Sequence, residues 1–331
     1  IRKFTVDDLQ LLLAERGEVD FIMRLQPEHW VDMTDNQSLR RSFHRSRYYD
    51  ANYAWVGWNQ ARPFFRDRRV RKALTMAIDV DKIIEYVLYG QGERITGPFV
   101  KQTDYYNQRI KPPPYDPAGA LELLAQAGWK RNKNGWLEKD GKRFEFTLIT
   151  NNGNDRRKSI LAIAQDAWKQ IGIDVRTDLL EWSVFIEERV DKADFDAVVL
   201  GWVMSVDPDL FQIWHSSQTH PYQLNFVGFK NQQADDLIIK IRQEYNHDRR
   251  VRYCRQLHEI IAREQPYTFL YVRKWTTVLD KRIVIREVDD QGRYQQWNEK
   301  PTVRYSVSMG IYVLEPRVID WIPNGFFNIP D

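Results

Sequence analysis

The sequence has 331 residues, 43% of them hydrophobic, which is enough chain for about two domains with buried cores. Its 49 basic and 46 acidic residues leave a formal net charge of +3, so charge predicts binding neither to nucleic acid nor to an anionic membrane. The single cysteine, Cys254, excludes an internal disulfide, and no apolar run is long enough to predict a membrane-spanning helix.

Local signals divide the chain into helices and strands. Helices are predicted where a capping side chain precedes apolar residues at helical spacing and a glycine follows, and strands where short β-branched or aromatic runs stand between turn residues. In chain order they predict a helix through 10–14, strands at 19–22 and 48–58, a helix at 67–78 capped by Asp67, a helix from 79 to Gly90, a helix from Asp116-Pro117 to 127, a hairpin of 136–137 with 144–150 around Asp140-Gly141, a helix at 159–171, and strands at 175–180 and 195–201. The proline-containing segment 91–116 is predicted to be irregular. This order of strands and helices predicts an α/β fold.

An aromatic stretch surrounds the last two predicted strands. Trp182 follows the strand at 175–180, and Trp202 follows the strand at 195–201, just before a turn at Asp207-Pro208. Ligands of open α/β sheets bind at the carboxyl ends of strands, so the flat apolar rings of these tryptophans predict a binding cleft. The alternative is that both rings are simple core aromatics.

Sequence patterns for catalysis and metal binding are absent. The chain has no GxSxG, no glycine-rich phosphate loop and no HExxH, and Cys254 has no base near it in the sequence. The 6 histidines show no metal-ligand spacing. We therefore expect a protein that is not an enzyme and that holds no metal or cofactor.

A series of ordered segments resembles the extracytoplasmic solute-binding proteins of the peptide and oligopeptide class, which supply ABC importers. The segments lie within residues 1–285 and are GEVD at 17–20, the block WNQARPFFRDRRVRKALTMAIDVDKII at 58–84, YDPAGALELLAQAGW at 115–129, EW at 181–182, FD at 195–196, GW with DPD at 201–209, and IAREQPYTFLY at 261–271. Each segment alone is weak, but their common order over this length is specific. The resemblance implies a periplasmic-binding-protein-like, two-lobed clamp that closes on a peptide or similar oligomeric solute. It also implies a monomer in the periplasm or another extracytoplasmic space, with the membrane permease subunits of an importer as partners.

The domain organisation follows from the same resemblance. The chain begins at Ile1 without a signal-peptide pattern, and we expect it to be the carboxyl-terminal part of such a protein. Residues 1–59 would then belong to lobe I, 60–270 to the α/β ligand-binding lobe II, and 271–331 to a return to lobe I with a tail of uncertain origin.

Three ligand-binding side chains are implied by the resemblance. Trp182 and Trp202 match tryptophans that form side-chain pockets in the family. Arg189 stands where some members hold an arginine that contacts a peptide carboxylate. The alternative for Arg189, which follows Glu187 and Glu188, is a solvated helix face.

The loop after Trp202 departs from the family pattern. Members commonly carry there an aspartate that pairs with the α-amino group of the ligand, whereas Ser205 stands at the matching place in a slightly shorter loop. A hydroxyl cannot neutralise an ammonium, and an unpaired buried charge is costly, so Asp207 or part of the first lobe would have to compensate. We expect the backbone of residues 203–207, from Val203 and Met204 to Asp207, to pair with the polar chain of the ligand, with Ser205 adding one hydrogen bond. The alternative for Asp207 is a turn and helix cap.

The last residues of the chain resemble a different family. Asn298-Glu299-Lys300-Pro301 and the run 308–316 are similar to a middle segment of sugar nucleotidyltransferases, in which such motifs help to hold a sugar phosphate. Ser308 stands where that family usually has asparagine, and its glycine-rich nucleotide loop appears nowhere in the chain. The alternative functions are therefore a sugar nucleotidyltransferase or a fusion to one. A strand-turn-strand with Gly292 in the turn would account for the same residues without any such activity.

Overall fold

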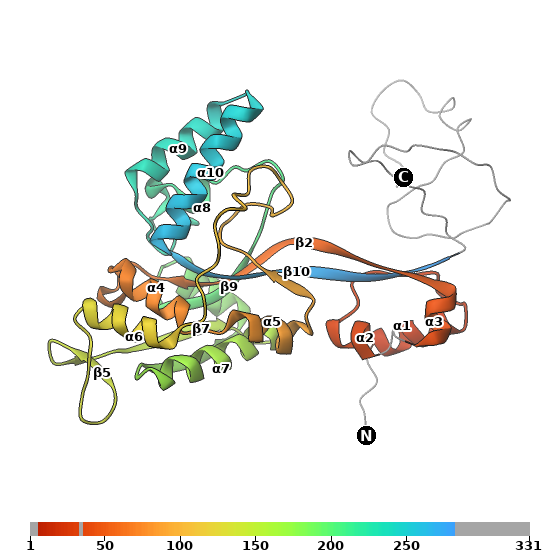
Figure 1. The fold of residues 1–331 in the computed structure, drawn as a ribbon, viewed down its shortest axis with the longest axis horizontal. Coiled ribbons are helices and arrows are strands. Elements are labelled where there is room, and N and C mark those ends of the chain that lie inside the picture. The colour runs from red at the N-terminus through yellow and green to blue at the C-terminus, as the bar shows by residue number, and fades with distance from the viewer. Residues whose placement is uncertain (1–5, 33–35, 282–331) are drawn as a thin grey trace. The chain divides into compact units, whose positions relative to one another are not determined.

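A computed structural model describes residues 6–32 and 36–281 of the chain (Figure 1). Contacts between residues divide the chain into one compact unit, Ile1–Ile283, and a second unit, Val284–Asp331. The second unit lies outside the described residues, and so does the strand-turn-strand predicted for it.

The first unit is built from alternating strands and helices. Its helices are α1 (Val6–Glu15), α2 (Pro27–Asp32), α3 (Gln37–Ser42), η1 (Pro63–Phe65), α4 (Arg68–Met76), α5 (Val80–Leu88), α6 (Pro117–Gln126), α7 (Asp155–Gln170), the π-helix η2 (Val184–Val190), α8 (Phe211–Trp214), η3 (Ser216–Gln218), α9 (Gln232–Gln243) and α10 (His247–Glu264). Its strands are β1 (Phe21–Ile22), β2 (Phe43–Trp58), β3 (Gly92–Arg94), β4 (Lys130–Arg131), β5 (Leu137–Lys139), β6 (Lys142–Arg143), β7 (Glu145–Asn151), β8 (Asp174–Leu180), β9 (Ala197–Val203) and β10 (Tyr267–Asp280).

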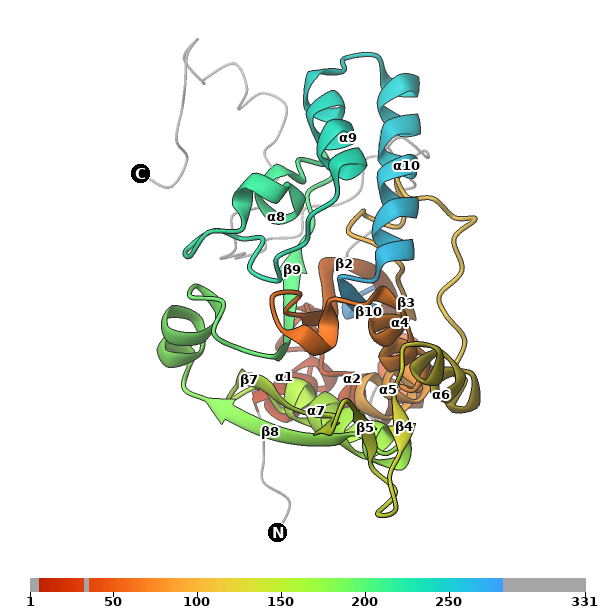
Figure 2. The same ribbon diagram turned by 90° about the vertical axis from the view of Figure 1, so that its left-hand side faces the viewer.

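One mixed sheet organises these elements. Its strand order is β1-β10-β2-β9-β7-β8, and β3 also pairs with β10. β7 runs parallel to both β8 and β9, whereas β2 is antiparallel to β9 and to β10. The parallel strands β7, β8 and β9 therefore end on the same side of the sheet (Figure 2).

Both faces of this sheet are buried under helices. Helices α4 to α7 cover one face (Figure 1). Trp58, Phe65 and Trp168 are fully buried in the core on this face. Helices α8 to α10 lie on the other face, over a core that contains Trp55 and Trp214. Strands covered on both faces are continuously apolar, which explains the run AVVL in β9.

The strands β2 and β10 are long and take part in two separate cores. The register of β10 against β2 is interrupted between Phe269 and Tyr271 and again between Val272 and Lys274. Up to Val272 β10 belongs to the two large cores, and beyond the second shift Val278 joins a smaller core with α1 to α3. The predicted boundaries at 59/60 and 270/271 stay a prediction, because both strands serve both regions.

Three predicted helix starts are confirmed, and an aspartate caps each of them, of which Asp67 was predicted as a cap. Asp67 accepts a hydrogen bond from the amide of Arg69, Asp79 from that of Lys82, and Asp116 from that of Gly119. The corresponding helices α4, α5 and α6 begin at the next residue in each case. Each cap satisfies an amide that has no partner inside its helix.

The pairing predicted for residues 144–150 was correct at Phe144 and wrong beyond it. The hairpin around Asp140-Gly141 pairs β5 with β6, with Lys139 opposite Lys142, and the amide of Phe144 donates a hydrogen bond of 2.8 Å to the carbonyl of Leu137. Residues 145–151 instead form β7, which pairs in parallel with β8 and β9 in the central sheet. The predicted strand at 195–201 lies two residues further on, so Trp202 is part of β9 and not of the loop.

Candidate ligand-binding site

The carboxyl ends of β7, β8 and β9 meet at one edge of the central sheet. Asn151 lies opposite Leu180, and Val203 lies opposite Asn52 of β2. These ends, together with Asn52, are called the carboxyl edge below. Both predicted tryptophans and the loop after β9 belong to this edge, as the sequence pattern indicates for a ligand site.

Trp202 is partly buried in a row of aromatic rings. Its ring stacks on Trp55 at 6.1 Å and on Phe226 at 5.8 Å between centroids, and Trp55 stacks on Tyr267 at 4.0 Å. The indole Nε1 of Trp202 donates a hydrogen bond of 3.1 Å to the phenol oxygen of Tyr267. Burial raises the pKa of Tyr267, so this phenol stays neutral. Trp202 is therefore fixed in orientation by the core although part of its ring reaches the carboxyl edge.

Trp182 lies at the same edge with few contacts. Its side chain is 52% exposed, and its ring is 6.1 Å from that of Phe185, which is fully buried at the start of η2. Burial of an exposed tryptophan by a ligand is favourable, because the ring carries a large apolar area. The position of Trp182 is compatible with the predicted pocket.

Arg189 already has an acidic partner. Its guanidinium lies 2.7 Å from the carboxylate of Asp194, which also pairs with Arg62 at 3.1 Å. All three side chains are substantially exposed. The role of Arg189 in binding a carboxylate stays a prediction, and a ligand would have to compete with Asp194 for it.

The start of the loop after β9 alternates between exposed and buried side chains. Val203 is 72% exposed, whereas Met204 is 7% exposed and its amide donates a hydrogen bond of 2.6 Å to the carbonyl of Ala51. Ser205 is exposed, and its hydroxyl has no hydrogen-bond partner among the described residues. The Met204 amide is therefore occupied by the protein, while the Ser205 hydroxyl is available to a ligand.

Two ion pairs fix the remainder of this loop to the helices beyond it. Asp207 pairs with Arg250 of α10 at 2.5 Å, and Asp209 pairs with Arg242 of α9 at 3.4 Å. Asp207 could neutralise a ligand ammonium only in competition with Arg250. The prediction that Asp207 neutralises the ligand ammonium in place of the aspartate that Ser205 replaces is therefore weakened, because Arg250 already neutralises the charge of Asp207.

Sequence reasoning missed a group of arginines at the same edge. Arg156 and Arg157 begin α7, directly after the turn that follows β7, and Arg273 lies in β10. The adjacent pair of arginines next to a strand end was a usable signal. Arg273 gave none, because only the register of the sheet brings β10 to this place.

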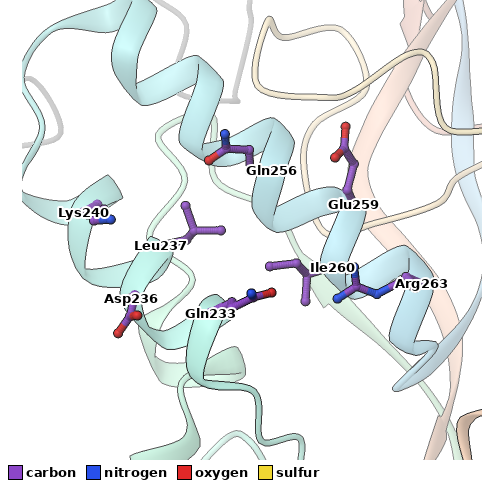
Figure 3. A pocket seen from close by; sticks show the side chains of 8 residues that line it. All are labelled: Gln233, Asp236, Leu237, Lys240, Gln256, Glu259, Ile260 and Arg263. Carbon is purple, nitrogen blue, oxygen red and sulfur yellow. The ribbon is translucent and has the colours of Figure 1, made fainter.

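A separate groove of about 320 Å³ lies between α9 and α10 (Figure 3). Its lining alternates in charge, with Asp236 and Lys240 on α9 and Glu259 and Arg263 on α10. None of its residues belongs to the carboxyl edge, so it is distinct from the predicted site. Within the described ranges, no cluster of histidine, cysteine and acidic side chains could hold a metal ion. Residues 6–32 and 36–281 also contain no helix that is long and apolar enough to cross a membrane.

Comparisons with known proteins match this fold and sequence to one family. The sequence pattern of the bacterial extracellular solute-binding proteins, family 5, middle region, matches residues 1–223. The oligopeptide-binding protein AppA of Bacillus subtilis (strain 168) is 42% identical over 229 residues, which are 66% of this chain and 41% of that protein. The chain spans about half the length of the curated relatives it matches.

Solved structures agree with the sequence matches. AppA of Bacillus subtilis in complex with a nonapeptide superposes with a TM-score of 0.70 at 33% identity, over 83% of this chain and 54% of that one. NikZ of Campylobacter jejuni in complex with Ni(L-His) gives 0.68 at 25% identity, over 83% and 55%. The predicted resemblance and the α/β, periplasmic-binding-protein-like fold class are confirmed. The likeness of 284–331 to sugar nucleotidyltransferases finds no support in these matches and stays a prediction.

Proposed function

We propose that this chain, which belongs to the bacterial extracellular solute-binding proteins of family 5, forms the ligand-binding part of the solute-binding component of an ABC importer. Its ligands would be peptides or similar oligomeric solutes. The observation that carries the proposal is the carboxyl edge, where the partly exposed Trp202 and the exposed Trp182 stand beside the loop after β9. The likeness to a relative bound to a nonapeptide supports peptides as the ligand class.

The site offers the side chains that would be needed to bind peptides of different sequences. Aromatic faces accept many apolar side chains, because stacking needs no specific hydrogen bonds. Trp182 and Trp202 would supply these faces, and the exposed hydroxyl of Ser205 would add one hydrogen bond to the polar chain of the ligand. The ion pairs of Asp207 and Asp209 fix the loop in advance, which reduces the entropy lost on binding.

The transport cycle would use closure of two lobes on the ligand. A ligand that contacts both lobes binds the closed state more tightly than the open state and shifts the population toward it. β2 and β10, which run through both the large cores and the small core of α1 to α3, are the strands that would transmit this movement. The closed protein would deliver its ligand to permease subunits outside the cytoplasm, as a monomer.

Calorimetric titration of the protein at its natural length with peptides of increasing length tests this function. We expect saturable binding of peptides, with a negative heat-capacity change from the apolar surface that the tryptophans bury. A nucleotide sugar serves as the control ligand and should produce no heat of binding. Binding of the nucleotide sugar in the absence of any peptide binding would refute the proposal.

A further inference from the structure

Three arginines lie at the carboxyl edge, two at the start of α7 and one in β10. Arg157 donates a hydrogen bond of 2.6 Å to the side-chain oxygen of Asn151, the last residue of β7. Arg156 donates one of 3.1 Å to the side chain of Gln26, which precedes α2. Arg273 of β10 lies 3.5 Å from Asp50 of β2. These arginines, called the arginine cluster below, come from segments more than a hundred positions apart in the sequence.

The cluster has more positive charge than its surroundings neutralise. Among the described residues, Asp50 is the one carboxylate within ion-pair distance of any of its three members. The side chains that accept hydrogen bonds from Arg156 and Arg157 are the neutral amides of Gln26 and Asn151. A guanidinium carries five N–H donors in a planar fork, so each arginine keeps donors for a further acceptor.

Burial makes this arrangement costly for the protein alone. The side chains of Arg273 and Asp50 are only 13% and 11% exposed. Burial and then the charge of Arg156 lower the pKa of Arg273 to about 10. Burial also raises the pKa of Tyr271, and the positive charges of Arg156, Arg273 and Arg157 oppose that rise. Like charges held together away from water destabilise the empty protein, and an anion that binds between them removes that cost.

We propose that Arg156, Arg157 and Arg273 form a subsite that binds a carboxylate of the ligand. This inference rests on the proposed function and names the chemistry that the site selects: peptides or other solutes that carry a negative charge at one end. Planar, bidentate pairing of guanidinium with carboxylate is the strongest form of such recognition. Arg156 and Arg157 suit it better than Arg189, because their hydrogen-bond partners are neutral amides whereas Arg189 pairs with the carboxylate of Asp194.

Three forms of one peptide separate the possible sources of the carboxylate. The first form has a free carboxyl terminus and no acidic side chain. The second has the same sequence with an amidated terminus, and the third is amidated but carries a glutamate as its last residue. Calorimetric dissociation constants are measured for each form with the protein at its natural length.

We expect at least one of the two carboxylate-bearing forms to bind the wild-type protein about tenfold more tightly than the neutral amide, as for a hydrogen bond to a charged group. Tighter binding of the first form identifies the main-chain carboxylate as the group that is bound, and tighter binding of the third identifies an acidic side chain. In Arg156→Gln and in Arg273→Gln the ratio of the dissociation constants of the neutral amide and the carboxylate-bearing form should fall toward one. The dissociation constant of the neutral amide itself should change little. Arg156→Lys should retain part of the preference for the carboxylate-bearing form, because the charge remains but the planar fork is lost.

A matched control removes one positive charge elsewhere in the same unit. Arg176 of β8 has a side chain that is 74% exposed, with a distant partner in Glu145 at 3.9 Å, so Arg176→Gln should keep the wild-type preference. Equal binding of all three peptides by the wild-type protein would overturn the inference and leave the proposed function standing. Loss of the preference in Arg189→Gln, but not in the cluster variants, would overturn it as well. If none of the three peptides binds, the proposed function fails together with the inference.

Discussion

Replacing Trp202 separates its contribution to folding from its contribution to binding. The structure gives the side chain one hydrogen bond, to Tyr267, and two ring contacts, with Trp55 and Phe226. The hydrogen bond contributes about 1 kcal/mol and each of the two aromatic pairs about 1 kcal/mol. Trp202→Ala should therefore reduce the free energy of unfolding by about 3 kcal/mol. Trp202→Phe keeps a ring in the row and loses only the hydrogen bond, which should cost about 1 kcal/mol.

The two substitutions should differ more strongly in ligand binding. Trp202→Ala removes the ring that stacks on the ligand and should weaken peptide binding by about tenfold or more, whereas Trp202→Phe should stay close to the wild-type affinity. Urea unfolding followed by circular dichroism measures stability, and calorimetric titration of the folded variants measures affinity. Trp182→Ala is the control for the stability measurement, because its exposed ring should contribute almost nothing to the free energy of unfolding. Wild-type affinity in Trp202→Ala would show that the ring serves the core alone.

Further predictions concern charge and pH. Ser205→Asp should shift ligand preference toward peptides with a free amino terminus over acetylated ones, and an unchanged preference in competition titrations would contradict the assignment of that position. Arg71 is 2% exposed and donates hydrogen bonds to the carbonyls of Phe65, Arg66, Glu264 and Gln265, so Arg71→Met should reduce the free energy of unfolding by about 3 kcal/mol or more, against a small change for the exposed Lys72→Met. Burial lowers the pKa of His258 to about 4, below its ordinary value, so the unfolded chain takes up a proton first as the pH falls. This contribution to stability is present above pH 6.5 and is lost as the pH falls toward 4. The free energy of unfolding should therefore fall by about 2 kcal/mol between pH 7 and pH 5. The same urea titrations should show a smaller fall of the free energy of unfolding in His258→Gln.

Local features of the fold were predictable, while pairings between distant segments were not. The helix caps Asp67, Asp79 and Asp116 act on amides a few residues away, so their pattern is complete within the sequence. The parallel pairing of β7 with β8 and β9 depends on the crossover helix between the strands, and the short turn at Asp140-Gly141 wrongly suggested a nearer partner.

In the candidate site, too, local features were predictable and contacts between distant segments were not. Trp182 and Trp202 could be placed at the carboxyl edge because each lies at or just after the end of a recognisable strand. The ion pair between Asp207 and Arg250 could not be foreseen, since it joins a loop to a helix that is distant in sequence. The arginine cluster escaped prediction for the same reason, because only the pairing of β10 with β2 places Arg273 in this part of the sheet.

Native mass spectrometry of the protein at its natural length, purified without added ligand, tests the central claim most directly. Solute-binding proteins that close on their ligands release them slowly, so a ligand acquired from the host should remain bound through purification. We predict a ladder of non-covalently bound masses in the range of peptides, which collisional activation removes. A retained nucleotide sugar would contradict this account, as would an unliganded protein that releases pyrophosphate from a nucleoside triphosphate.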